Sequence, residues 1–204
     1  MIRILCADIS SADERIYENL YGKASPERKR RADRYLCRED KLRCVTADAL
    51  LRIALKTDAF TVLKSDFGKP YIEDHEGFHY NLSHSGRYVV IAWGDAEVGV
   101  DVQQHYADTD MRMIAERCFS RDEQDYIRQS DQQILQRFYE VWTGKESYLK
   151  YIGEGLRKDL RSFSIRNLDP EIRCLYRVLG DEYSLSLCTK DKEFTFELSD
   201  VRQL

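Results

Sequence analysis

The sequence predicts an α+β protein built from two similar halves. Helical periodicity is followed by short β-rich runs, and this order occurs twice along the chain. The 204 residues suit one domain, or two small units that share a core. No linker rich in Pro, Gly or Ser separates the halves, so we expect them to pack tightly. We place the join near residues 102–106, which gives an N-terminal subdomain, 1–103, and a C-terminal subdomain, 104–204.

The first half begins with a strand over residues 2–9. Ser25-Pro26 then opens a helix, because Pro is favoured in the first helical turn. A second amphipathic helix follows, and its apolar positions recur at helical spacing. These positions are Leu42, Val45, Ala49 and Ile53. After the turn-rich "DFGKPY" come three β-rich runs, at residues 78–83, 88–93 and 98–103.

The second half repeats the order of helices followed by strands. Ser120 and Glu123 in "SRDE" form a capping box for a helix from about residue 121. A long helix at roughly 132–152 ends before Gly153 and Gly155. Four strands are then expected, in "SFSIRNL", "IRCLYRVL", "YSLSLCT" and "FTFELSDV".

The composition indicates a globular protein of the cytoplasm. The N-terminal "MIRILCADIS" has too short an apolar run for a signal peptide, and no later run reaches the length of a membrane span. The six cysteines show no C-x-x-C spacing, so neither a zinc site nor a disulfide framework is indicated. We expect reduced thiols that behave as small buried hydrophobes.

Residues 27–43, "ERKRRADRYLCREDKLR", carry a net charge of +4 on a chain whose total is −4. One continuous helix would line up Arg28, Arg31, Arg34 or Tyr35, and Arg38 along one face. A single basic face on an acidic protein suggests a phosphate-bearing ligand. The acidic remainder and the short patch argue against nucleic acid. A solvated helix face is an equally good interpretation of this segment alone.

The strand "VGVDVQ" offers a candidate metal site. Its alternation buries Val98, Val100 and Val102 on one face. Asp101 and Gln103 share the other face, beside Gly99, which leaves space for a ligand. Oxygen donors suit Mg²⁺, which takes few protein ligands. An Asp at a strand end is more often a turn or cap residue, so this signal is weak by itself.

The stretch "FYEVWTGKESYLKYIGEGL", residues 138–156, places a lysine among hydrophobic positions. At 3.6 residues per turn an apolar stripe contains Phe138, Val141, Trp142, Leu149 and Ile152, with Lys145 near its centre. A polar stripe beside it contains Tyr139, Thr143, Glu146 and Lys150. Snorkelling could explain Lys145, and a surface i,i+4 pair could explain Glu146 with Lys150.

The pair Ser83-His84 in "NLSHSGRYV" invites a hydrolase interpretation. Adjacent strand residues face opposite ways, however, and no G-x-S-x-G elbow accompanies them. We therefore set a hydrolase aside.

Together these segments closely resemble the 4′-phosphopantetheinyl transferases of the surfactin-synthetase-activating type. The resemblance runs from about Ser25 to Ile165. It rests on the basic segment, "FGKPY", "NLSHSGRYVV", "VGVDV" and the W-x-x-K-E helix. The G-[VI]-D and W-x-x-K-E-[SA]-[YF]-x-K signatures, about forty residues apart in this order, are together highly specific.

The resemblance implies two pseudo-symmetric subdomains, each with helices on a small antiparallel sheet, and coenzyme A in the cleft between them. It implies a monomer that transfers phosphopantetheine to a serine of an apo acyl or peptidyl carrier protein. The reaction needs Mg²⁺ and releases 3′,5′-adenosine bisphosphate. Fatty-acid, polyketide and nonribosomal-peptide carriers are all candidate partners.

Site residues follow from the same resemblance. Asp101 and Glu146 match the metal carboxylates, with Gln103 standing where this type often has Glu. Glu146 holds Mg²⁺ or accepts the serine proton, and Lys150 stabilises the leaving phosphate. We expect Lys145 to face phosphate, or to pair with a buried carboxylate of the other half. The coenzyme A contacts are expected from Arg28, Arg31, Arg43, Cys44 and His84 (3′-phosphate), Phe67, Gly68, Lys69 and Pro70 (adenine), and Ser83 (pyrophosphate).

Two other functions remain open from the sequence. A coenzyme A-binding protein of this fold without transfer activity would explain Gln103. A nucleic-acid-binding module would use the basic helix. We expect the transferase, with neither nucleic acid nor a membrane as partner.

Overall fold

The computed structural model describes residues 1–155 and 158–204. In chain order the elements are β1 (Ile2–Asp8), α1 (Glu14–Lys23), α2 (Pro26–Ala32), α3 (Arg38–Leu55), β2 (Val62–Lys64), β3 (Pro70–Ile72), β4 (His79–Ser85), β5 (Tyr88–Gly94), β6 (Val98–Gln104), α4 (Met111–Cys118), α5 (Arg121–Arg128), η1 (Asp131–Gln133), α6 (Ile134–Ile152), η3 (Leu160–Ser162), β7 (Arg173–Leu179), β8 (Tyr183–Thr189), β9 (Phe194–Asp200) and η4 (Val201–Gln203). Leu156, the last residue of the quoted W-x-x-K-E stretch, lies outside the described residues.

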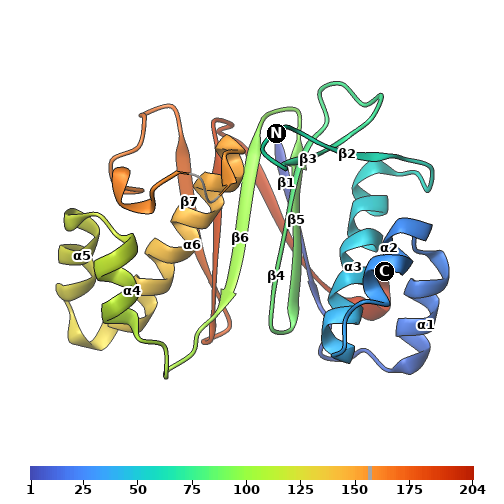
Figure 1. The fold of residues 1–204 in the computed structure, drawn as a ribbon, viewed down its shortest axis with the longest axis horizontal. Helices are drawn as coiled ribbons and strands as arrows, with labels where there is room; N and C mark the ends of the chain where they lie inside the picture. Colours follow the sequence, from blue (N-terminus) through green and yellow to red (C-terminus); the bar gives the residue numbers. More distant parts are fainter. Residues whose placement is uncertain (156–157) are drawn as a thin grey trace.

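The strands occupy the centre of the molecule, with α1–α3 on one side and α4–α6 on the other (Figure 1). One sheet has the order β4-β5-β1-β9, a second the order β6-β8-β7, and β2 and β3 form a short hairpin. One apolar core joins α1–α3 to the four-stranded sheet, and a second fills the space between the two larger sheets. The predicted α+β class with small sheets is confirmed, and the strand pairs of the two larger sheets are antiparallel except for β1 with β9.

Sheet pairing interlocks the two predicted halves. β9, near the end of the chain, adds to the N-terminal sheet by pairing in parallel with β1. β6, which we had assigned to residues 1–103, pairs antiparallel with β8 of the second sheet. Each sheet therefore uses strands from both sides of the boundary predicted at residue 103.

Side chains of β4 join the two sheets along a seam. They take the place of the backbone carbonyls that a neighbouring strand would present to β6. Their oxygens accept hydrogen bonds from three backbone N–H groups of β6: Asn81 from Val100 (2.9 Å), Ser83 from Val102 (3.3 Å) and Ser85 from Gln104 (3.0 Å). The seam fixes β6, which carries the candidate metal ligands, against the N-terminal sheet.

The helices of the first half differ from the prediction in three ways. The basic segment is not one helix, because the chain leaves helical geometry between Ala32 and Arg38. The predicted single basic face is therefore wrong. Helix α1 was not predicted, since Leu20 is its only fully buried residue. Ile53 of α3 is 41% exposed, although its spacing predicted a core position.

The second half follows the prediction at α5, α6 and the last three strands. The capping box of Ser120 and Glu123 is present. Helix α4 was not predicted. The expected strand in "SFSIRNL" is wrong, because residues 160–162 form a 3₁₀ turn and irregular backbone follows. In the described part of the chain, no helix combines the length and the apolar character that crossing a membrane requires.

Candidate active site

Helix α6 packs directly against β6, and Gly99 permits this contact. A Cβ at Gly99 would lie 2.0 Å from the Ser147 carbonyl oxygen and 2.3 Å from the Tyr151 nitrogen. The glycine therefore makes room for the helix backbone, and not for a ligand as we had expected. The predicted alternation is confirmed, because Val98, Val100 and Val102 belong to the core between the sheets.

Asp101 is held by two donors that come from different elements. Its Oδ1 accepts from Ser83 Oγ of β4 at 2.8 Å and from Lys150 Nζ of α6 at 2.7 Å. Lys150 also donates to the Val100 carbonyl at 3.1 Å. The Asp101 side chain is only 9% exposed. Ser83 thus orients Asp101. The resemblance had instead suggested that Ser83 contacts the pyrophosphate.

Glu146 lies one helical turn before Lys150 on α6. Its carboxylate makes no hydrogen bond or ion pair with the residues that the structure describes. Burial raises the pKa of Glu146, the negative charge of Asp101 raises it further, and Lys150 lowers it. The two carboxylates thus face a shared space, in which the charge of Asp101 disfavours the charged form of Glu146.

The donor set of this space fits a small divalent cation. Asp101 and Glu146 supply carboxylate oxygens, and a cation between them would relieve their repulsion. Gln103 uses its amide nitrogen in a bond to the Gln104 carbonyl at 3.2 Å, which leaves its amide oxygen available. Among the described residues no group of three or more His, Cys, Asp or Glu side chains clusters as in an all-protein metal site. Such a cation would therefore need further ligands from the substrate or from water.

Four cationic or titratable groups from different elements gather beside the carboxylates. The pKa of His84 is lowered, and the largest cause is loss of hydration, although His84 remains partly exposed to solvent. The charges of Arg43, Lys150 and Arg31 lower it further. Arg43 is anchored by the Gly86 carbonyl at 2.7 Å and by Asp40 at 2.7 Å. We call His84, Arg31, Arg43 and Lys150 the cationic cluster, and its chemistry suits a phosphate.

Arg28 is less available than the other predicted phosphate ligands. Its Nε lies 3.4 Å from the buried carboxylate of Asp48, which also binds Arg52 at 2.8 Å. The Cys44 thiol is buried and donates to the Arg28 carbonyl at 3.9 Å. Cys44 therefore contacts the backbone of α2, where the resemblance placed it near the 3′-phosphate.

The "FGKP" segment lines a pocket of about 250 Å³. Phe67, Tyr71, Phe78 and Tyr80 supply its rings, and Ile152 and Gly153 close it from the end of α6. Lys69 does not point into free space, because its ammonium group binds Glu97 and the Tyr151 carbonyl. We call this the aromatic pocket. A larger hollow of about 340 Å³ between α1 and α3 contains none of the predicted site residues.

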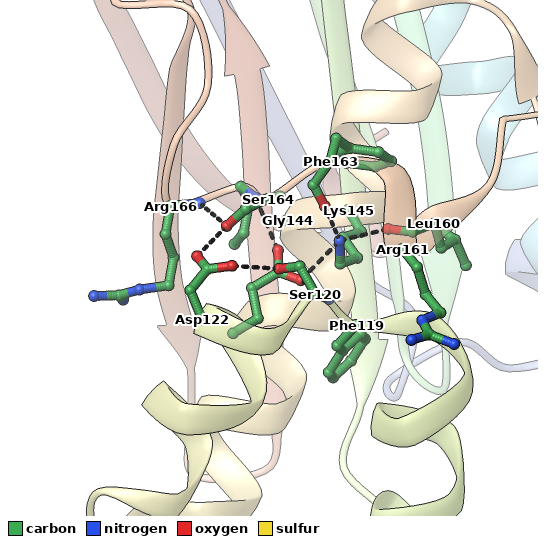
Figure 2. Close-up of polar contacts among 12 residues, drawn as sticks. Phe119, Ser120, Asp122, Gly144, Lys145, Leu160, Arg161, Phe163, Ser164 and Arg166 are labelled. Carbon is green, nitrogen blue, oxygen red and sulfur yellow. Dashed lines mark hydrogen bonds and ion pairs between the residues drawn. The ribbon is translucent and has the colours of Figure 1, made fainter.

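Lys145 is the clearest correction to the predicted site. Its side chain is 1% exposed, and its Nζ lies 2.8 Å from the Glu123 carboxylate. The same Nζ donates to the Leu160 carbonyl at 2.8 Å and to the Phe163 carbonyl at 2.7 Å (Figure 2). All three ammonium protons are thereby used. Its partner carboxylate belongs to the same half of the chain, and not to the other half or to a phosphate. We therefore assign Lys145 to the structure of the C-terminal half and remove it from the catalytic set.

Sequence reasoning missed several side chains that position the site. Glu123 was noted as a capping residue, yet it also accepts from the Ile165 backbone at 2.8 Å and neutralises Lys145. Asn81 and Ser85 complete the seam, and Glu97 pairs with Lys69 and His79. Only the capping box gave a sequence signal, because the other contacts join residues far apart in the chain.

The class of protein now follows from fold and comparisons together. The sequence profile of the 4′-phosphopantetheinyl transferase superfamily matches residues 97–200, which include β6 and α6. The chain is 31% identical over 196 residues to a 4′-phosphopantetheinyl transferase of Bacillus subtilis, a match that covers 87% of each chain. It is 34% identical over 150 residues to the transferase Sfp of Bacillus subtilis (strain 168), which covers 70% of this chain and 66% of Sfp.

A vertebrate protein is also similar. The L-aminoadipate-semialdehyde dehydrogenase-phosphopantetheinyl transferase of Xenopus laevis is 27% identical over 84% of this chain and 63% of its own length. The chain belongs to the 4′-phosphopantetheinyl transferase superfamily and is an enzyme of this class.

Proposed function

We propose that the protein transfers the 4′-phosphopantetheine group from coenzyme A to a serine of an apo carrier protein and releases 3′,5′-adenosine bisphosphate. One arrangement carries the proposal. Asp101 and Glu146 lie beside the cationic cluster, so acceptors for a cation or proton adjoin donors for phosphate. We propose the cytoplasm as its compartment, because the spacing of the six cysteines indicates no disulfide framework. We propose that it acts as a monomer.

Coenzyme A would bind through its charged and aromatic parts. Arg31, Arg43 and His84 would bind a phosphate that lies apart from the reacting phosphorus, because the two arginines lie close enough to His84 to affect its pKa. Rings of the aromatic pocket suit the flat faces of an adenine, and Ile152 supplies an apolar edge. Binding energy from these remote parts would hold the pyrophosphate near Lys150.

Asp101 and Glu146, assisted by the Gln103 amide oxygen, would hold Mg²⁺. The metal, when bound, supplies positive charge at phosphate oxygens. Lys150 adds an ammonium group to stabilise the leaving bisphosphate, while Ser83 keeps Asp101 oriented.

Glu146 is the candidate acceptor for the proton of the attacking serine. The proposed role needs a carboxylate that is free to bind a proton, and Glu146 has no hydrogen-bond partner among the described residues. In the metal-free protein, burial and the charge of Asp101 raise the pKa of Glu146, so its surroundings favour binding of a proton.

Mass spectrometry of carrier proteins tests the proposal. Apo-carriers from fatty-acid, polyketide and nonribosomal-peptide systems are incubated with enzyme, coenzyme A and Mg²⁺. We expect at least one to gain the mass of a phosphopantetheine group, and Glu146→Gln to abolish the gain. Coenzyme A binding with no mass gain on any carrier would support the inactive coenzyme A-binding protein instead.

A further inference from the structure

Two cysteines face each other beneath the catalytic helix. Cys174 of β7 and Cys188 of β8 are direct partners in the antiparallel register. Both thiols point at one atom of α6, the carbonyl oxygen of Gly144, at 4.0 and 3.9 Å. Neither is in a disulfide, and neither has a part in the proposed transfer.

The backbone geometry of this pair permits a disulfide. Directly opposed residues on antiparallel strands have Cα atoms about 4.5–5.5 Å apart. Disulfides occur at Cα separations of about 4.4–6.8 Å. Both sulfurs lie within 4.0 Å of the same Gly144 carbonyl oxygen, so they are near neighbours. Bond formation therefore needs side-chain rotation and a small shift, and no new strand pairing.

The two thiols differ in reactivity in a way that suits stepwise oxidation. Burial raises the pKa of Cys188 well above its usual range, which keeps this thiol protonated. The neighbouring Cys188 thiol lowers the pKa of Cys174, burial opposes this effect, and Ser147 lowers the pKa further. Cys174 is half-buried and lies on β7, an edge strand of its sheet. Cys174 is therefore the thiol that ionises first and that a small oxidant reaches first.

The pair is mechanically connected to the site. Ser147 Oγ lies 3.3 Å from Cys188 Sγ and donates to the Gly144 carbonyl at 2.9 Å. Glu146 lies between Gly144 and Ser147 in the sequence of α6. A disulfide brings the sulfurs to about 2.05 Å and removes both thiol protons. The Gly144 carbonyl would then lose two donors, and the packed helix above the sulfurs would shift.

We propose that Cys174 and Cys188 are a reversible redox modification site at which a peroxide forms a disulfide that lowers the rate of transfer. The Cys174 thiolate attacks a peroxide oxygen, which gives a sulfenic acid and hydroxide. The Cys188 sulfur then attacks the Cys174 sulfur and displaces the oxygen, and its proton leaves with that oxygen as water. Two thiols and one hydrogen peroxide thus give one disulfide and two waters. A dithiol reverses the reaction.

The test oxidises the full chain with hydrogen peroxide and removes the excess with catalase. Peptide mapping then looks for a Cys174–Cys188 link, and transfer is measured with a coenzyme A whose thiol is blocked by alkylation. We expect the link to form and the rate to fall by about tenfold to a hundredfold, because an ångström-scale misplacement of a catalytic group can cost up to about a hundredfold in rate. Dithiothreitol should restore the rate.

Two variants control for other cysteines. Cys174→Ser, or Cys174→Ala if the serine variant does not fold, should transfer normally and resist peroxide. Cys37→Ser removes the exposed cysteine and should stay sensitive. The proposal is overturned if no link forms while Cys37 oxidises, or if the link forms and the rate is unchanged.

The effect on rate rests on the proposed function, whereas the link itself does not. If reduced enzyme transfers nothing to any carrier, the proposed function fails. Peptide mapping and the unfolding temperature of the oxidised chain then still decide whether the disulfide forms.

Discussion

The Lys145 ammonium group lies 2.8 Å from the Glu123 carboxylate, and the two side chains are 1% and 0% exposed. Burial lowers the pKa of Lys145, and Glu123 partly offsets that effect. The pair also fastens the chain around residues 160–165 to α5 and α6, because both partners bind backbone atoms there. A buried ion pair thus shapes one wall of the C-terminal half.

Lys145→Met should destabilise the protein by about 3–5 kcal/mol, because it leaves Glu123 buried without a counter-charge. Chemical denaturation measures this loss. Adding Glu123→Gln should recover a large part of the stability, since the amide is neutral and keeps an acceptor oxygen. Lys190→Ala, which breaks the exposed pair with Glu171, should cost no more than about 1 kcal/mol. If folded Lys145→Met loses affinity for coenzyme A, our structural assignment of Lys145 is wrong.

Glu146→Gln should reduce transfer by about a hundredfold or more, the usual contribution of a general base. It should also raise the unfolding temperature at neutral pH, because it removes a carboxylate that burial and Asp101 destabilise. Glu140→Gln is the matched control, as a half-buried carboxylate of the same helix that bonds Tyr126. Unchanged transfer at saturating Mg²⁺ would remove Glu146 from the mechanism.

The titration of Glu146 in the metal-free protein should respond to its two charged neighbours with opposite signs. Asp101→Asn should lower the pKa of Glu146, and Lys150→Met should raise it, because these charges act in those directions. Carbon-13 NMR of protein with labelled glutamate measures the pKa of Glu146 directly, and the measurement does not require an active enzyme.

The raised pKa also has a consequence for stability. A raised pKa in the folded state adds stability that is fully present below the unfolded pKa and is lost as pH rises through the folded pKa. Wild type should therefore lose this contribution on going from acidic to neutral pH, whereas Glu146→Gln should not. In the titration experiment, a change of the Glu146 pKa in the same direction in Asp101→Asn and in Lys150→Met would contradict the positions assigned to these two charges.

Arg31→Ala should raise the KM for coenzyme A by about tenfold or more, the usual value of a hydrogen bond to a charged group. Dephospho-coenzyme A, which lacks the 3′-phosphate, should show no change. Arg30→Ala, an exposed arginine of the same helix, is the control. Arg28→Ala should in addition lower stability, because Asp48 loses one of its two arginines. Equal effects on both substrates would assign Arg31 to another task.

Gln103→Glu should strengthen Mg²⁺ binding to the protein without coenzyme A, because a carboxylate is a stronger donor than an amide oxygen. In wild type, Mg²⁺ and coenzyme A should each strengthen the binding of the other, since the substrate pyrophosphate completes the ligand set. Calorimetric titration measures both effects. Gln104→Glu, on the opposite strand face, should leave the affinity unchanged. Equal affinities for Gln103→Glu and wild type would place Gln103 outside the reach of the metal.

Part of the geometry of the candidate site was predictable, because strand and helix periodicity assign side chains to faces. Alternation in "VGVDVQ" put Asp101 and Gln103 opposite the buried valines, and helical spacing put Glu146 and Lys150 one turn apart. The resemblance then assigned them to a family. Local patterns of this kind depend on near neighbours in the chain, which a sequence displays directly.

The partners of these residues were decided by the tertiary structure alone. The spacing of residues along the sequence does not predict that Ser83 and Lys150 both bind Asp101. Nor does it predict that Glu123 pairs with Lys145, or that β9 pairs with β1. A glycine at position 99 could leave space for a ligand or for another part of the chain. The structure shows the second, because the backbone of α6 packs against Gly99. A buried charge needs a counter-charge from whatever segment packs against it, and that segment is fixed by how the whole core closes.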